Sequence, residues 1–129
     1  MTDPHEPVHV ILDDTAMAAA GRGNLLASRL IHRAHAEPGW YLYVTACALV
    51  EADRARPGTG EHIAALPGVT VLDLDLTAAL SVARQDSWAL AHTLYAAQPT
   101  PERPSGAVVA TATPDAWAGH PVRVLDLTP

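Results

Sequence analysis

Four carboxylates stand where strands are predicted to end or helices to begin, and residues of this type can bind a divalent metal ion. Asp13 closes the apolar run 9–12, Glu51 lies in the helical stretch after 41–45, Asp86 opens the segment 87–97, and Asp115 follows 107–113. Because the carboxyl ends of parallel strands share one edge of a sheet, these side chains could meet there. Mg²⁺ and Mn²⁺ prefer carboxylate and water oxygens, often together with phosphate oxygens of a substrate. The four acids therefore predict a site in which a divalent ion activates water to hydrolyse a phosphodiester.

The elements that would position these acids alternate along the chain. Short aliphatic or β-branched runs predict strands at 8–12, 40–45, 69–74, 107–111 and 122–127. Helices are predicted at 15–20, 25–36, 46–56, 59–66, 77–84 and 87–97, with Pro-Gly pairs closing several of them. Such alternation favours βαβ units with right-handed crossovers. The predicted fold class is α/β: a three-layer α/β/α sandwich with a central, mostly parallel sheet of about five strands.

Size and charge limit the other possibilities. The 129 residues predict a single domain, 1–129, with a flexible N-terminus at 1–7. A net charge of −6, with eight Arg and no Lys, argues against broad electrostatic capture of nucleic acid, so such a substrate would need a metal ion. The single Cys47 forms no intrachain disulfide and indicates a reducing compartment, and its place in the apolar stretch 45–50 predicts a buried small hydrophobe. No basic leader or long apolar segment is visible, which predicts a cytoplasmic protein without a membrane partner.

The order and spacing of the acidic motifs resemble those of the PIN-domain metal-dependent ribonucleases, which include the VapC-like toxins of bacterial toxin-antitoxin pairs. The resemblance covers nearly the whole chain and rests on 10–15 (VILDDT), 48–54 (ALVEADR), 86–93 (DSWALAHT) and 113–115 (TPD). It implies that Mg²⁺ or Mn²⁺ is bound by four acids that are also catalytic: Asp13, Glu51, Asp86 and Asp115. It also implies that Thr15 or Thr113 supports this cluster or the substrate by hydrogen bonding.

The same resemblance implies an activity and partners. The reaction would be endonucleolytic cleavage of RNA that leaves a 3′-hydroxyl and a 5′-phosphate. An antitoxin protein and a second copy of the chain are the further partners that it implies. The RNA target stays open.

Neighbouring acids leave some site positions open. Asp14 competes with Asp13, although Asp13 directly follows the aliphatic run. Asp53 competes with Glu51, but Asp53 is predicted to be a solvated helix charge. Asp86 could instead cap the exposed amides of the helix that follows it.

The last motif departs most from the family. A proline-rich loop at 98–106 separates it from the third motif, Ala116 follows Asp115, and no basic rim for gripping RNA is evident. Asp115 could be a turn residue after Pro114. The three tryptophans, Trp40, Trp88 and Trp117, are predicted to be packing or rim residues, although Trp117 could stack a base. The second hypothesis is therefore a catalytically degenerate PIN-like module that binds proteins.

Other classes of site fit less well. A response-regulator receiver would use the acids at 13–14, Asp73 or Asp75, and Thr111 or Thr113, but it also needs a Lys, and the chain has none. The seven His residues are scattered rather than grouped at the spacing of a zinc site. Neither a G-x-S-x-G elbow nor a Gly-rich phosphate loop is present.

Overall fold

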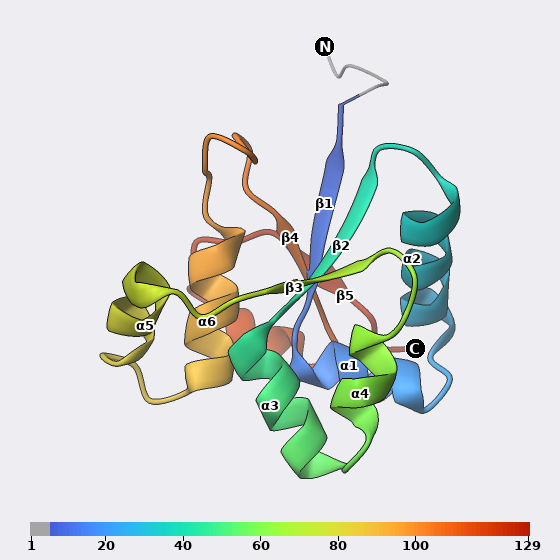
Figure 1. Cartoon of the computed structure of the whole chain (residues 1–129), viewed down its shortest axis with the longest axis horizontal. Helices are drawn as coiled ribbons and strands as arrows, with labels where there is room; N and C mark the ends of the chain where they lie inside the picture. Colours follow the sequence, from blue (N-terminus) through green and yellow to red (C-terminus); the bar gives the residue numbers. More distant parts are fainter. Residues whose placement is uncertain (1–5) are drawn as a thin grey trace.

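A five-stranded parallel sheet forms the centre of the molecule (Figure 1). The structure is a computed structural model that describes residues 6–129. Its strands are β1 (Val8–Leu12), β2 (Trp40–Thr45), β3 (Val69–Leu72), β4 (Val108–Thr111) and β5 (Val124–Asp126). They lie side by side in the order β3-β2-β1-β4-β5, and every neighbouring pair is parallel. The aliphatic runs predicted to be central strands occupy the middle of this sheet, where both faces are covered.

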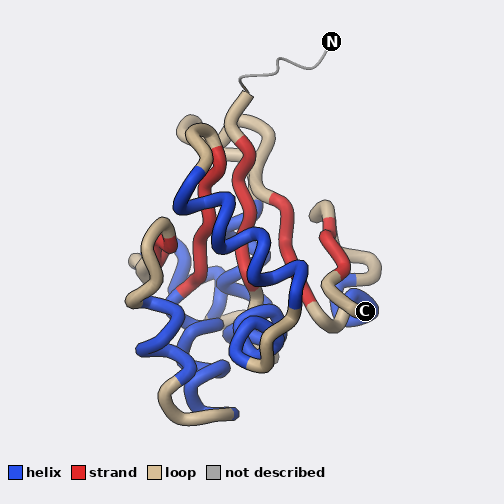
Figure 2. The backbone as a smooth tube through the Cα atoms, turned by 90° about the vertical axis from the view of Figure 1, so that its right-hand side faces the viewer, coloured by secondary structure: helices blue, strands red, loops and turns tan. Residues whose placement is uncertain are grey.

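Helices cover both faces of the sheet. They are α1 (Asp14–Gly21), α2 (Leu25–Ala36), α3 (Ala46–Ala55), α4 (Thr59–Ala64), α5 (Leu76–Val82) and α6 (Trp88–Ala97), followed by the 3₁₀ helix η1 (Pro114–Trp117). Val10 and Leu12 pack with residues of α1 to α4 in one core cluster, whereas Ile11 packs with residues of α6 and η1 in the other. This alternation follows from the two-residue period of a strand. Figure 2 shows α2 lying across one face, and the predicted three-layer α/β/α sandwich is confirmed.

The chain changes direction across the sheet at β1. From β1 it proceeds through β2 to the edge strand β3, and it then returns to place β4 and β5 on the other side of β1. Ligands of open α/β sheets commonly bind at the carboxyl ends of the two strands where the order reverses. In this sheet those strands are β1 and β4.

Most elements begin or end one or two residues away from the sequence prediction, and side chains that cap helices explain two of the differences. The third strand ends at Leu72 rather than at 74, and Asp75 accepts a hydrogen bond from the Ala78 amide at 2.9 Å to begin α5. The helix α6 begins at Trp88, where the Ser87 hydroxyl accepts a hydrogen bond from the Leu90 amide at 3.2 Å. The cap of α6 is therefore Ser87, and Asp86 lies before it.

Asp53 has a structural role that the sequence did not suggest. Its Oδ1 accepts hydrogen bonds from the amides of Gly58 and Gly60, each at 3.0 Å, and so holds the turn between α3 and α4. The expectation of a solvated helix charge is wrong for this residue, because its carboxylate is engaged with backbone donors.

Two further expectations concern the N-terminal segment and the membrane. The segment 1–7, predicted to be flexible, lies mostly outside the described residues, and only Glu6 and Pro7 of it can be placed, both exposed before β1. Within residues 6–129, none of the helices has the length and apolar content to cross a membrane.

Candidate functional site

A cavity of about 710 Å³ opens at the carboxyl ends of β1 and β2. Its wall contains three carboxylates from separate segments, Asp14, Glu51 and Asp86, and one basic side chain, Arg54. The volume lies within the range of about 300–1,000 Å³ that is usual for ligand sites. Sequence segments that are far apart therefore contribute acids to one cavity, as the four-acid prediction required in outline.

Three helices begin at this cavity. Asp14, Ala46 and Trp88 are the first residues of α1, α3 and α6, and all three line the wall. The first amides of a helix lack intrahelical acceptors, and the helix dipole places positive potential at that end. The cavity consequently combines carboxylates, which attract a cation, with helix ends that favour a phosphate group.

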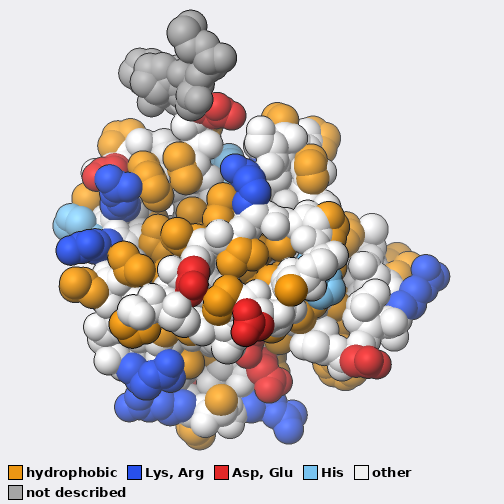
Figure 3. Space-filling model, turned by 180° about the vertical axis from the view of Figure 1, so that it is seen from behind, with side chains coloured by type: hydrophobic (Ala, Val, Ile, Leu, Met, Phe, Trp, Pro, Cys, Tyr) orange, Lys and Arg blue, Asp and Glu red, His pale blue; other side chains and the backbone are white. Residues whose placement is uncertain are grey.

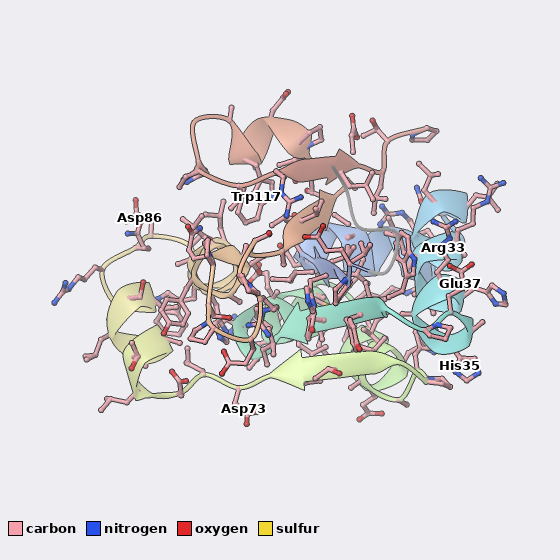
Figure 4. All side chains as sticks on the ribbon, turned by 90° about the horizontal axis from the view of Figure 1, so that it is seen from above. Arg33, His35, Glu37, Asp73, Asp86 and Trp117 are labelled. Carbon is pink, nitrogen blue, oxygen red and sulfur yellow. The ribbon has the colours of Figure 1, made fainter. Side chains whose placement is uncertain are left out.

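Asp14 carries unbalanced negative charge. Burial raises the pKa of its carboxyl group, and the negative charges of Asp13 and Glu51 raise it further, although its own amide and that of Thr15 act in the opposite direction. In the described part of the chain, the one side-chain ion pair joins Arg33 to Glu37 at 3.6 Å on α2 (Figure 4). A bound cation would therefore relieve repulsion that no salt bridge relieves at this cavity.

Asp13 lies behind the cavity rather than on its wall. Its side chain is 3% exposed. Oδ1 accepts hydrogen bonds from the Ala16 amide at 2.8 Å and from the Thr15 hydroxyl at 2.7 Å, and Oδ2 accepts one from the indole nitrogen of Trp117 at 3.0 Å. Asp13 thus caps α1 and fixes Trp117, and both of its oxygens are engaged with the protein.

Threonine hydroxyls close the crevice between β1 and β4. Thr15 and Thr111 lie 3.1 Å apart, Thr111 and Thr113 lie 3.3 Å apart, and the Thr113 hydroxyl donates to Thr15 at 3.4 Å. The Thr15 hydroxyl also accepts the Ala112 amide at 3.0 Å. Thr15 therefore supports Asp13 by hydrogen bonding, while Thr113 lies at the exposed end of this network.

Asp115 lies apart from the other predicted acids. It is exposed in η1 and is absent from the wall of the cavity. Its neighbour Trp117 is 3% exposed, so this ring is a packing residue, as expected, and is not open to stack a base. Figure 4 shows Trp117 against the sheet and Asp86 at a distance from it, on the loop before α6. Glu51 and Asp86 therefore line the cavity together with Asp14, whereas Asp13 lies behind its wall and Asp115 does not line it.

Residues of the cavity that sequence reasoning did not select had recognisable signals. Asp14 follows an Asp that stands at the N-cap position of α1, so the second acid of the pair points elsewhere. Cys47, expected to be a buried small hydrophobe, is partly exposed and lines the cavity, and burial raises the pKa of its thiol. Trp88 directly follows the cap Ser87 and is 67% exposed.

The donor set suits a hydrated divalent cation better than a closed metal cage. Asp14 and Glu51 share the cavity and affect each other electrostatically. Over residues 6–129 no group of three or more His, Cys, Asp or Glu side chains is arranged to hold a metal ion. Mg²⁺ usually keeps several waters and needs only one or two carboxylates in addition to substrate oxygens. The pair of acids meets that requirement, and the four-acid cluster expected from the sequence does not form.

Buried polar side chains fix the relative positions of α3 and α6, whose first residues form the cavity. His92 of α6 is 1% exposed, and its Nδ1 accepts a hydrogen bond from the Cys47 amide at 3.3 Å. The hydroxyls of Thr93 and Thr45 lie 3.2 Å apart. Because both contacts join α6 to the first turn of α3, the shape of the cavity depends on them.

We expect stability to fall with decreasing pH below 6.5, in part through His92. Burial lowers the pKa of His92 below its ordinary value of 6.5, so at slightly acidic pH the unfolded chain binds a proton that the folded chain does not. The contribution of neutral, buried His92 to the free energy of unfolding is complete above pH 6.5 and is lost as the pH falls towards the folded pKa. The free energy of unfolding then changes by at most about 1.4 kcal/mol per pH unit. Urea unfolding from pH 7.5 to 5 measures this slope.

Two variants test whether His92 causes the slope of stability against pH. His92→Asn should flatten it, whereas His62→Gln, at an exposed position of α4, should leave it unchanged. His9 also has a lowered pKa, through burial and the nearby charge of Arg103, and contributes to the slope in the same direction as His92. An unaltered slope in His92→Asn would contradict the assignment.

No relative supplies a function for this site. Comparisons with protein-family models, with curated proteins and with solved structures gave no match to the chain. What the site can do follows from its own side chains: two neighbouring carboxylates, a third on the loop before α6, and the positive ends of three helices.

Proposed function

We propose that this protein is a divalent-metal-dependent ribonuclease, and that the cavity of Asp14, Glu51 and Asp86 is its active site. The observation that supports this most is the meeting of carboxylates and three helix N-termini in one cavity at the carboxyl edge of a parallel sheet. The arrangement accommodates a cation and a phosphate together. The resemblance of the acidic motifs to PIN-domain ribonucleases supports RNA as the substrate.

Each part of the cavity has a role in this proposal. Asp14 and Glu51 would hold Mg²⁺ or Mn²⁺, and the phosphate would lie at the N-termini of α3 and α6, near those first-turn amides that the helix caps and His92 do not occupy. A divalent ion in this position supplies activation of water and neutralisation of charge on the phosphate. Asp13 positions α1, and through it Asp14, without touching the substrate. Arg54 adds the single basic side chain of the wall.

The surface charge is consistent with a need for a metal ion. Arg side chains are dispersed over the face seen in Figure 3 rather than gathered into one basic patch. The net charge of −6 opposes the approach of RNA. A cation in the acidic cavity would attract the phosphate that the rest of the surface does not attract.

A non-catalytic interaction module is the second candidate function. It is favoured by exposed apolar side chains on α3, α5, α6 and the loop after β3: Val50, Leu74, Leu76, Leu80 and Trp88. Exposed apolar surface of this kind often marks a protein interface. An antitoxin-like protein or a second copy of the chain, in a cytoplasmic setting, is the partner that the resemblance offers.

Cleavage of an RNA panel by the purified protein separates the two functions. Structured and single-stranded RNAs are incubated with Mg²⁺, Mn²⁺ or EDTA, beside an Asp14→Asn preparation that controls for contaminating nuclease. Metal-dependent cleavage that disappears in the variant supports the ribonuclease. Absence of cleavage with either metal would refute it and leave the interaction module.

A further inference from the structure

Trp88 is a large aromatic side chain that lies largely exposed at the proposed active-site cavity. It is 67% exposed, although it lines the cavity wall together with Glu51 and Asp86. The other two tryptophans have partners in the described structure: Trp117 is buried against Asp13, and the Arg33 guanidinium lies 4.5 Å from the ring centroid of Trp40. Among the described residues, no aromatic or cation-π pair includes Trp88.

The wall of the cavity carries two chemically different kinds of group. Asp14, Glu51 and the helix N-termini are polar, whereas the side chains of Val50, Leu74 and Trp88 are apolar. A nucleotide has the same division, because its phosphate seeks cations and amide donors while its base seeks a flat apolar surface. A nucleotide whose phosphate lies at the acids could therefore place its base against the indole.

We propose that Trp88 stacks a nucleobase adjacent to the scissile phosphate. This inference deepens the proposed ribonuclease function and rests on it for the position of the phosphate. In a duplex both faces of a base are covered by its neighbours, so only an unpaired, unstacked base can lie on the ring. Trp88 is thus a specificity-determining residue, because a base stacked on its ring makes the site prefer single-stranded RNA to a duplex.

Binding without cleavage tests the inference separately from the nuclease reaction. Fluorescence anisotropy of a 5′-labelled single-stranded RNA octamer is measured with Ca²⁺ in place of Mg²⁺, and a gel afterwards checks that the RNA is intact. Trp88→Ala should weaken binding by at least about 5-fold, the lower end of the loss of one base-aromatic stack. Trp88→Phe should keep most of the affinity, and the same RNA in a duplex should bind more weakly than the single strand.

A matched control and a second signal distinguish stacking from a change in fold. Leu80→Ala removes another exposed apolar side chain that does not line the cavity, and it should bind like the wild type. RNA should quench the tryptophan emission of the wild type, and this quenching should be lost in Trp88→Phe. Equal binding by Trp88→Ala and wild type, or equal affinity for single strand and duplex, would overturn the inference.

The outcomes also separate the inference from the proposed function. Trp88-dependent binding of single strands without any cleavage in Mg²⁺ or Mn²⁺ would refute the ribonuclease and retain the stacking site. Metal-dependent cleavage together with unchanged RNA binding in Trp88→Ala would support the ribonuclease and overturn the stacking site. A wild type that binds no RNA but forms a dimer, which Trp88→Ala converts to monomer, would overturn the inference in favour of a protein interface.

Discussion

Asp14→Asn is expected to abolish metal-dependent RNA cleavage while leaving the fold at least as stable at neutral pH. The pKa of Asp14 is raised in the folded protein by burial and by its acidic neighbours, so its ionised form is less favourable there than in the unfolded chain. The resulting destabilisation is present above the folded pKa and is relieved as the pH falls through it. A neutral amide removes this cost at pH 7 and also removes a cation ligand. The expected loss of cleavage rate is at least about 100-fold, because even indirect partners of a metal ion are worth about 10–100-fold.

Two further variants test whether the loss of cleavage is specific to carboxylates that line the cavity. Glu51→Gln should lose a similar amount of activity, because Glu51 lines the same cavity. Asp73→Asn, at an exposed acid after β3 and outside the cavity, should retain activity (Figure 4). Cleavage rates and urea unfolding curves at pH 7 are the measurements. Full activity in Asp14→Asn, or a loss of more than about 1 kcal/mol of its stability, would contradict the role given to this carboxylate.

Asp13→Ala is expected to lower the free energy of unfolding by about 3 kcal/mol or more. Three donors would lose their acceptor: the Ala16 amide, the Thr15 hydroxyl and the indole N–H of Trp117. Loss of a helix cap alone costs about 1 kcal/mol, and each buried donor left unpaired adds about 1–3 kcal/mol. Thermal unfolding followed by circular dichroism should show a decrease in Tm of about 10 °C.

A double-mutant cycle isolates the contact between Asp13 and Trp117. Trp117→Phe removes the indole donor and should cost about 1–3 kcal/mol, and Asp13→Asn combined with it should cost less than the sum of the single changes. Asp115→Asn is the matched control, because its exposed carboxylate makes no hydrogen bond in the described structure. Additive effects of the two substitutions would show that the 3.0 Å contact contributes nothing to stability.

The α/β class was predictable because its signals are local. The aliphatic run of β1, the aromatic and β-branched run of β2, and the Pro-Gly turns after α2 and α3 indicate where strands and helices begin and end. The end of β3 was harder to predict, since residues 71–76 alternate Leu with Asp and resemble one longer strand. What ends that strand is the side chain of Asp75, whose hydrogen bond to the Ala78 amide begins α5.

The site was predictable only in outline. Its location at the carboxyl edge follows from parallel strands, and two of the acids selected from the sequence, Glu51 and Asp86, line the cavity there. The choice between Asp13 and Asp14 depends on Trp117, which lies 104 residues away in sequence and gives no local signal. Asp115 follows β4 in sequence, yet η1 leaves it exposed and turns Trp117 inward to occupy the space beside Asp13.

The pairing of β1 with β4 also governs how the chain acquires its structure during synthesis. Val10 pairs with Val108, so one edge of this innermost strand has no partner until residue 108 has been made. At about 5–20 residues per second, translation leaves that edge open for roughly 5–20 s. An unpaired strand edge can recruit other chains, and contacts between distant residues form slowly. The nascent chain is therefore most prone to aggregation before residue 108 emerges from the ribosome, and the last strands to be translated end that exposure.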